Sequence, residues 1–183
     1  VRAIAEIWAQ SLETTSEDRT LIVTPLFHCA ASHCFSIPTI VNGGTVIIEE
    51  AFIIEQTLKA LEREKVTIFF GVPAIYSTLL NAPNMKETDL SHLRLFTYGA
   101  APMPYELVKR LKTSYPDVKV QNLYGQTENS PGATTLKDHY ALEKIGSVGE
   151  PLPYTQVRVV GEDGEDVPPF AVGEIIVKGP QVM

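Results

Sequence analysis

Hydrophobic and polar positions along the chain follow two alternating periods, which predict helices placed between strands. In Ile54–Glu64 apolar residues recur at helical spacing between charged ones, whereas Thr45–Ile48 and Val66–Phe70 are short runs rich in β-branched and aromatic residues. The first pattern is typical of a helix with one buried face, the second of a buried strand. The predicted helices are Val1–Leu12, Ala30–Val41, Ile54–Glu64, Pro73–Leu80 and Pro104–Tyr115. The predicted strands are Thr20–Thr24, Thr45–Ile48, Val66–Phe70, Leu93–Tyr98 and Val118–Leu123.

Strands that alternate with helices of about 10–15 residues indicate βαβ units. We therefore predict an α/β fold, with a largely parallel sheet and flanking helices. After Gly132 the pattern changes, because Val157–Val160 and Gly173–Lys178 read as strands with no helix between them, which predicts a short antiparallel β element. A boundary is expected near Gly149–Pro153. The predicted division is an α/β core over residues 1–150 and the start of a β subdomain over residues 151–183.

Composition and charge exclude several classes of function. The chain of 183 residues is 44% hydrophobic and 20% charged, which is typical of a globular protein. Its net charge of −7, without a basic cluster, argues against a nucleic-acid partner and against an anionic membrane surface. No apolar run approaches the ~20 residues of a transmembrane helix, and the first residues do not resemble a signal peptide. We expect a cytoplasmic protein, and peripheral contact with a membrane stays open.

The two cysteines, Cys29 and Cys34, are five positions apart in an apolar stretch. A small disulfide is one interpretation, but two free thiols in a reducing compartment is the preferred one. Together with His28 and His33 they include metal-ligand residue types, yet their spacing matches no zinc pattern.

Four loops follow predicted strands and are expected at one edge of the sheet. They are Pro25–Cys29, Gly71–Pro73, Gly99–Pro102 and Tyr124–Glu128. The carboxyl ends of parallel strands share an edge, and ligands of such sheets bind there. We therefore expect the four loops to form one pocket. The last two follow consecutive strands joined by one helix, so we expect them to be near neighbours.

The loop Tyr124–Glu128 combines the groups that a nucleotide site needs. The Tyr124 ring can stack on a base, Gly125 leaves room for phosphates, and the Thr127 hydroxyl can donate to a phosphate oxygen. Glu128 supplies the hard carboxylate oxygen that Mg²⁺ prefers. The alternative is a surface turn with a solvated Glu128. Neither a dinucleotide fingerprint nor a Walker-type phosphate loop occurs in the chain.

Two further loops have both a structural and a functional interpretation. Gly99, Ala100 and Ala101 are small enough for a flat ligand to lie against the backbone, but with Pro102 they also suit a tight strand-to-helix turn. His28 could line a tunnel or orient a carboxylate. It could equally be a half-buried histidine bonded to a backbone carbonyl.

Six motifs in order resemble one family. They are T-P-L-F-H (Thr24–His28), D-L-S-H-L-R (Asp89–Arg94), Y-G-A-A-P (Tyr98–Pro102), Y-G-Q-T-E (Tyr124–Glu128), G-S-V-G-E-P-L-P (Gly146–Pro153) and G-E-I-I-V-K-G-P (Gly173–Pro180). The sequence resembles the adenylate-forming superfamily of acyl-CoA synthetases, luciferases and peptide-synthetase adenylation domains. The resemblance covers nearly the whole chain.

The resemblance implies a role for each matching residue. Thr127 would contact the α-phosphate of ATP, Glu128 would bind Mg²⁺, and His28 would sit between the acyl pocket and the channel for the pantetheine of CoA. Asn122 is expected to narrow the base or acyl pocket slightly. The adenine would be flanked by Gly99, Ala100 and Ala101 and stacked on Tyr124, with Gln121 and Gly125 completing the pocket floor.

The implied reaction joins a carboxylic acid to ATP, releases pyrophosphate and passes the acyl group to CoA. Because Phe27–Ala30 contains no acid to pair with a substrate ammonium, an apolar substrate is expected. It is a fatty or an aryl carboxylic acid, with the fatty-acid type preferred. The alternatives are an amino-acid-activating domain, a luciferase-like member and a non-catalytic α/β module.

The family's phosphate loop with its lysine is expected upstream of Val1. The ribose-binding aspartate, the hinge and the small C-terminal domain with its catalytic lysine are expected beyond Met183. The segment alone is therefore expected to be inactive, with the C-terminal domain of the same chain as its partner.

Overall fold

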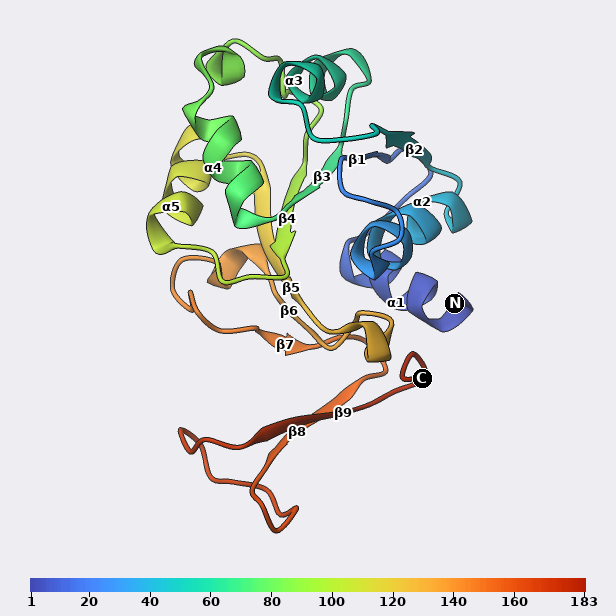
Figure 1. Cartoon of the computed structure of the whole chain (residues 1–183), viewed down its shortest axis with the longest axis vertical. Coiled ribbons are helices and arrows are strands. Elements are labelled where there is room, and N and C mark those ends of the chain that lie inside the picture. The colour runs from blue at the N-terminus through green and yellow to red at the C-terminus, as the bar shows by residue number, and fades with distance from the viewer.

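Five parallel strands form the centre of this computed structural model, which describes residues 1–183 (Figure 1). The seven-stranded sheet has the order β2-β1-β3-β4-β5-β6-β7, and the first five strands in this order pair in parallel. β6 and β7 extend the sheet in antiparallel fashion beside β5. The strands are β1 (Arg19–Ile22), β2 (Thr45–Ile48), β3 (Ile68–Gly71), β4 (Leu95–Gly99), β5 (Lys119–Tyr124), β6 (Thr134–Leu136) and β7 (Glu150–Pro151).

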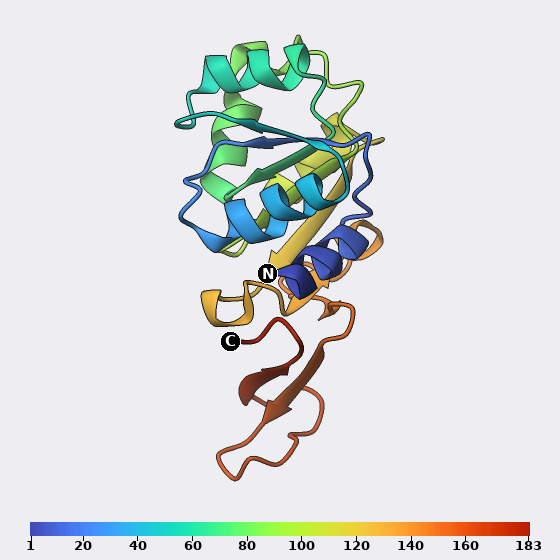
Figure 2. The same ribbon diagram turned by 90° about the vertical axis from the view of Figure 1, so that its right-hand side faces the viewer.

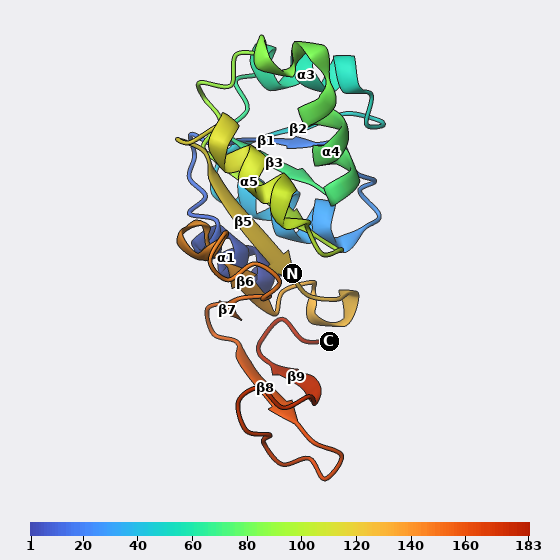
Figure 3. The same ribbon diagram turned by 90° about the vertical axis from the view of Figure 1, so that its left-hand side faces the viewer.

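Helices cover both faces of this sheet, as expected for a parallel arrangement. One face carries α3 (Ile54–Arg63), α4 (Pro73–Asn81) and α5 (Tyr105–Ser114), with α4 and α5 in front in Figure 3. The other carries α1 (Arg2–Ser11) and α2 (Ile37–Val41), in front in Figure 2. All residues of β3 and β4 are buried between these layers. The predicted α/β class is confirmed.

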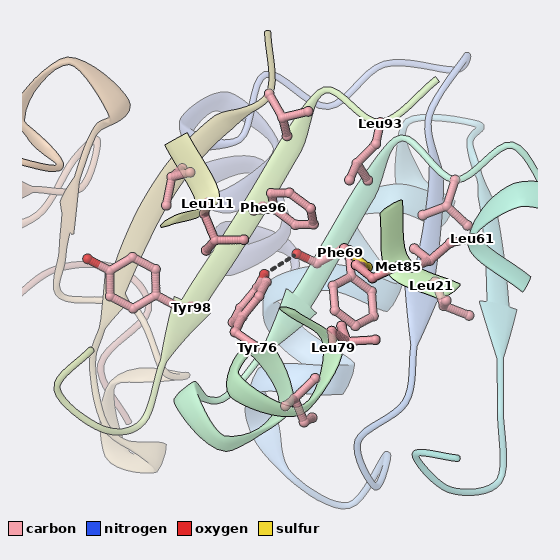
Figure 4. Close-up of a cluster of buried hydrophobic side chains, with 14 of the residues drawn as sticks. Leu21, Leu61, Phe69, Tyr76, Leu79, Met85, Leu93, Phe96, Tyr98 and Leu111 are labelled. Carbon is pink, nitrogen blue, oxygen red and sulfur yellow. Dashed lines mark hydrogen bonds between the residues drawn. The ribbon is translucent and has the colours of Figure 1, made fainter. Parts of the chain in front are cut away.

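The hydrophobic core between the sheet and α3–α5 is built around Tyr76 of α4 (Figure 4). Its ring meets Phe69 and Phe96 edge-on, at centroid distances of 5.9 and 5.5 Å. Its hydroxyl donates to the Thr97 carbonyl at 2.8 Å, which satisfies a polar group with no access to water. Burial raises the pKa of Tyr76 well above its ordinary value. The packing of Tyr76 against Phe69 and Phe96 fixes the relative position of β3 and β4. Two of the predicted loops follow these strands.

The predicted helix Ala30–Val41 is two helices in the structure. A π-helix η1 spans Ala30–Ser36 and continues directly into α2. Pro38 lacks the N–H that a regular helix would use, and the Ser36 hydroxyl donates a hydrogen bond to the Ala31 carbonyl at 2.8 Å. These two features disrupt the regular ladder at this point.

At the amino edge of the sheet, half-buried Arg94 forms an ion pair with the buried carboxylate of Asp18. Arg94 donates from Nε and Nη2 to the two carboxylate oxygens of Asp18, each at 2.8 Å. Thr67 Oγ1 donates to the same carboxylate at 2.7 Å. Burial alone would raise the pKa of Asp18, but the hydrogen bonds from Arg94 and Thr67 outweigh it and lower that pKa. Arg94 thus has a structural partner at the edge opposite the predicted site.

A separate two-stranded sheet follows the core. β8 (Gln156–Val160) and β9 (Glu174–Lys178) pair antiparallel, which confirms the predicted β element, and they project away from the main sheet in Figure 1. The division at residue 150 stays a prediction, and β7 pairs with β6 across that position. Three short 3-10 helices complete the structure, η2 (Pro83–Lys86), η3 (Thr127–Asn129) and η4 (Asp138–Tyr140), the first within the predicted loop of residues 81–90. No helix has the length and apolar character that crossing a bilayer requires.

Candidate functional site

A pocket of about 260 Å³ opens at the carboxyl edge of the sheet, where β4 and β5 end side by side. The register pairs Tyr98 with Asn122 and Gly99 with Leu123, so the loops after the two strands start next to each other. The expected proximity of these loops is confirmed. The lining residues are Tyr98, Ala100, Ala101, Pro102, Met103, Asn122, Leu123, Tyr124, Gly125, Gly146, Ser147 and Val148.

The first wall of the pocket is a backbone turn with almost no side chains. A Cβ atom at Gly99 would lie 2.5 Å from the Leu123 carbonyl oxygen of β5, so a side chain here would push the strands apart. Ala100 has φ = +64°, a left-handed conformation that non-glycine residues rarely adopt. Both Ala100 and Ala101 are exposed. The tight turn and the open backbone surface are therefore the same feature, and the two interpretations of this loop do not exclude each other.

The second wall begins at Tyr124, whose side chain is exposed at the pocket. Gly125 follows, and a Cβ there would lie 1.5 Å from the Pro131 carbonyl oxygen. The chain folds back on itself at this point: the Ala133 N–H donates to the Tyr124 carbonyl at 3.0 Å. Gly125 was expected to leave room for phosphates, but closure of its own loop already requires a glycine.

Thr127 and Glu128 lie on the short helix η3, one turn beyond the pocket lining. Both are exposed, and the Glu128 carboxylate makes no hydrogen bond or ion pair with another side chain. The Gln126 N–H donates to Asn129 Oδ1 at 2.9 Å, which caps this turn.

The residues fit a magnesium ion bound together with a substrate. No group of three or more His, Cys, Asp or Glu side chains that could hold a metal ion occurs in the structure. Glu128 can thus supply one protein ligand only. Mg²⁺ is usually bound in this way, by one or two carboxylates together with substrate phosphates and water.

The loop Pro25–Cys29 reaches the same region from β1. Cys29 Sγ lies 3.4 Å from Thr127 Oγ1, although 98 positions separate the two residues. His28 is exposed, and its ring packs against that of Phe27 at an angle of 46°, with 4.7 Å between the ring centroids. His28 is therefore not the half-buried, carbonyl-bonded residue of the structural interpretation. The expectation that all four loops form one pocket is therefore wrong, because neither Pro25–Cys29 nor Gly71–Pro73 lines it.

The cysteines are both free thiols, in agreement with the preferred interpretation. Cys34 is buried on η1, and burial raises the pKa of its thiol well above the ordinary value. Cys29 is only half-buried and belongs to the loop beside Thr127. The two thiols thus differ strongly in access to solvent.

The assignment of Gln121 to the pocket floor is wrong. Its side chain lies on the opposite face of β5, is 6% exposed, and donates to Thr135 Oγ1 at 2.8 Å. Successive side chains of a strand point to opposite faces, so Asn122 lines the pocket instead. Its Nδ2 approaches the Tyr98 carbonyl at 3.5 Å, which leaves most of the amide free.

A third wall, Gly146–Val148, was not predicted from the sequence. The Thr134 hydroxyl of β6 donates to the Val148 carbonyl at 2.6 Å and holds this segment over the pocket. A Cβ at Gly149 would lie 2.0 Å from the Thr135 carbonyl oxygen. The sequence signal for this wall is the motif G-S-V-G (Gly146–Gly149), whose pattern alone predicts no function.

This arrangement defines a class of protein: an α/β protein with a pocket at the carboxyl edge of a mostly parallel sheet, between two glycine-containing loops. The chain belongs to the AMP-binding enzyme family, whose match covers residues 1–183.

Relatives and solved structures share this architecture. A feruloyl-CoA synthase of an Amycolatopsis species is 44% identical over 174 residues, which are 93% of this chain and 34% of that protein. A fatty acyl CoA synthetase of Mycobacterium tuberculosis superposes with a TM-score of 0.89 at 31% identity, over 99% of this chain and 35% of that one. The O-succinylbenzoate CoA synthetase of Bacillus subtilis, in complex with ATP and magnesium, superposes with a TM-score of 0.88 at 31% identity. The match covers 98% of this chain and 36% of that one. The chain therefore spans about a third of the length of these proteins.

Proposed function

We propose that this chain forms the nucleotide-binding part of an acid–thiol ligase that activates a carboxylic acid with ATP and transfers the acyl group to CoA. The observation that carries the proposal is the meeting of Ala100–Ala101 and Tyr124–Gly125 in one pocket, with Thr127 and Glu128 on the next turn. The match to AMP-binding enzymes over all 183 residues supports the same interpretation.

Each pocket residue has a role that follows from its position. The adenine lies between the backbone of Ala100–Ala101 and the ring of Tyr124, since exposed aromatic faces stack on bases. Asn122 carries the one side-chain amide in the pocket lining, and an amide can pair with the donor and acceptor edge of adenine. This pocket takes the base, and the phosphates extend toward η3.

The chemistry takes place at the α-phosphate. A carboxylate oxygen of the acid attacks the α-phosphorus, and the bond to the β-phosphate oxygen breaks as pyrophosphate leaves with the electron pair. Negative charge on the phosphate oxygens is stabilised by the Thr127 hydroxyl, which donates a hydrogen bond. Glu128 holds Mg²⁺, which supplies charge neutralisation when bound. CoA thiolate then attacks the acyl carbon and displaces AMP.

The acid is apolar, because the residues that face the site from the loop Pro25–Cys29 include no carboxylate. The sequence predicts a fatty or an aryl acid, with the fatty acid preferred. The 44% identity with a feruloyl-CoA synthase, against 31% with a fatty acyl CoA synthetase, favours an aromatic acid instead. Exposed Phe27 beside His28 suits an aromatic ring as well as an alkyl chain.

Pyrophosphate release by the full-length enzyme tests the function and the substrate class together. The screen supplies ATP, Mg²⁺ and CoA with straight-chain acids of graded length, aryl acids and amino acids. We expect aryl acids to give the highest kcat/KM. A preference for straight-chain acids would support a fatty acid as the substrate. Pyrophosphate release that depends on an amino acid and not on CoA would favour an amino-acid-activating domain. Absence of release with every acid would contradict the ligase function.

Alkylation of Cys29 provides a test of nucleotide binding that does not need turnover. A phosphate against Thr127 covers the neighbouring thiol, which lies 3.4 Å from the Thr127 hydroxyl. We expect Mg-ATP at ten times its Kd to slow modification of Cys29 by N-ethylmaleimide about tenfold, in proportion to 1 + [L]/Kd. Mass spectrometry of the full-length enzyme measures the modified peptide. Buried Cys34 is the internal control and stays unmodified with or without ATP. Equal rates at Cys29 in both conditions would contradict the assigned phosphate position.

A further inference from the structure

The chain segment after β9, Gly179–Met183, lies against the loop that carries the proposed phosphate and magnesium ligands. The Met183 N–H donates to the Glu128 carbonyl at 2.9 Å. The Ser130 hydroxyl donates to the Gln181 carbonyl at 2.8 Å. Figures 1 and 2 both show the C-terminus beside the turn that follows β5. The segment thus contacts the middle residue of η3 and a residue just after it.

Gln181 makes the central contacts of this segment. Its side chain is 4% exposed, and its Nε2 donates to the Gly132 carbonyl and to Thr155 Oγ1, each at 2.9 Å. The orientation of the amide follows from chemistry, because a carbonyl oxygen only accepts and the nitrogen must face it. Thr155 directly precedes β8. A single buried amide therefore joins three segments: the loop after β5, the start of β8 and the end of the chain.

The loop 127–132 needs such support from outside. η3 is only three residues long, and 3-10 turns of this length have little stability of their own. Ser130 adopts the left-handed conformation with φ = +56°, which is unfavourable for a residue other than glycine. Both features persist only when neighbouring groups hold them.

We propose that Gln181 is a positioning residue for the adenylation reaction, which it serves by fixing the loop that presents Thr127 and Glu128. The inference rests on the proposed function. It assigns to the region beyond β9 an effect on the magnesium and phosphate ligands that acts through the loop, since Gln181 touches neither of them. Because catalytic groups misplaced by about 1 Å can lower the rate about 10²-fold, loosening this loop acts on turnover rather than on the acyl pocket.

The test replaces Gln181 by methionine in the full-length enzyme. Gln181→Met keeps the length of the side chain and removes the donors to Gly132 and Thr155. We expect kcat to fall roughly 10- to 100-fold and the Mg²⁺ concentration for half-maximal rate to rise, while the KM of the acid changes little. Thr39→Val is the matched control, since it removes the buried 2.8 Å hydrogen bond between Thr20 and Thr39, which contacts no residue of the site.

The outcomes separate this inference from the proposed function. If the wild-type enzyme releases no pyrophosphate with any acid, the result contradicts the proposed function, and with it the inference that rests on it. If the wild type is active and Gln181→Met lowers kcat and shifts the Mg²⁺ dependence while Thr39→Val does neither, the positioning function is supported. Equal effects of the two substitutions, or an unchanged Mg²⁺ dependence in Gln181→Met, would overturn it.

A second variant decides the question if Gln181→Met does not fold. Ser130→Ala removes only the hydrogen bond from the Ser130 hydroxyl to the Gln181 carbonyl. We expect a smaller shift in the same direction, with kcat and the Mg²⁺ dependence changed and the KM of the acid retained. A Ser130→Ala enzyme with wild-type Mg²⁺ dependence would then overturn the proposal.

Discussion

Glu128→Ala is expected to reduce Mg²⁺-dependent pyrophosphate release by the full-length enzyme about 10²- to 10³-fold, the usual effect of removing a group that stabilises transition-state charge. Glu128 is exposed, lacks a side-chain partner and belongs to no cluster of metal-binding side chains, so no neighbouring carboxylate replaces it. The support of the loop survives the substitution, because Met183 bonds to the backbone carbonyl of residue 128. The loss therefore reports on the carboxylate and not on the fold.

The measurement is initial rate against free Mg²⁺ at fixed ATP. Glu162→Ala is the control, since Glu162 is also exposed but lies in the turn between β8 and β9. We expect the control to keep wild-type rates. Near-wild-type turnover in Glu128→Ala would refute the assignment of Glu128 to the metal.

Gly149→Ala is expected to lower the free energy of unfolding by about 3–5 kcal/mol. This is the combined cost of an alanine in the left-handed backbone conformation and of the steric clash between its Cβ and the neighbouring backbone. Gly149 has φ = +84°, and its Cβ would lie 2.0 Å from the Thr135 carbonyl oxygen. The backbone of β6 cannot move away, because it pairs with β5 on its other side. The third wall of the pocket is displaced with it, so nucleotide affinity falls as well.

Gly146→Ala is a matched control in the same segment. Gly146 has a similar φ of +90°, but nothing lies within 4 Å of its Cβ position. We expect a loss of only about 1–2 kcal/mol, the conformational cost alone. Urea denaturation of the two variants and the wild type gives the comparison. Equal destabilisation by both substitutions would show that the contact with Thr135 does not form.

The five central strands could be predicted from the sequence because each lies in a short apolar stretch, and a helical pattern follows each of β1 to β4. β6 and β7 could not be predicted. They contain three and two residues, too short for any periodicity, and their pairing with the sheet alone defines them. The third pocket wall was missed for the same reason, since β6 brings Gly146–Val148 to the site.

The error at Gln121 has a different origin. β5 reads Lys-Val-Gln-Asn-Leu-Tyr, in which polar and apolar residues do not alternate. Gln121 and Asn122 are adjacent polar residues on opposite faces of the strand, so the pattern does not tell which of them faces the pocket. Only the three-dimensional structure shows that Asn122, and not Gln121, lines the pocket. The position of Tyr124–Glu128 could be predicted, because the loop after a parallel strand lies at the carboxyl edge of the sheet whichever way the strand's side chains point.

The contact between Ser130 and Gln181 joins residues 51 positions apart, and it affects how the site forms during synthesis. When residue 130 leaves the ribosome, both strands of the pocket have been made, but the segment that holds the loop has not. At about 5–20 residues per second, its arrival takes roughly another 3–10 s. During this interval the nascent chain carries Thr127 and Glu128 on a turn that lacks these contacts, and we expect nucleotide to stabilise the sheet only after translation has passed Gln181.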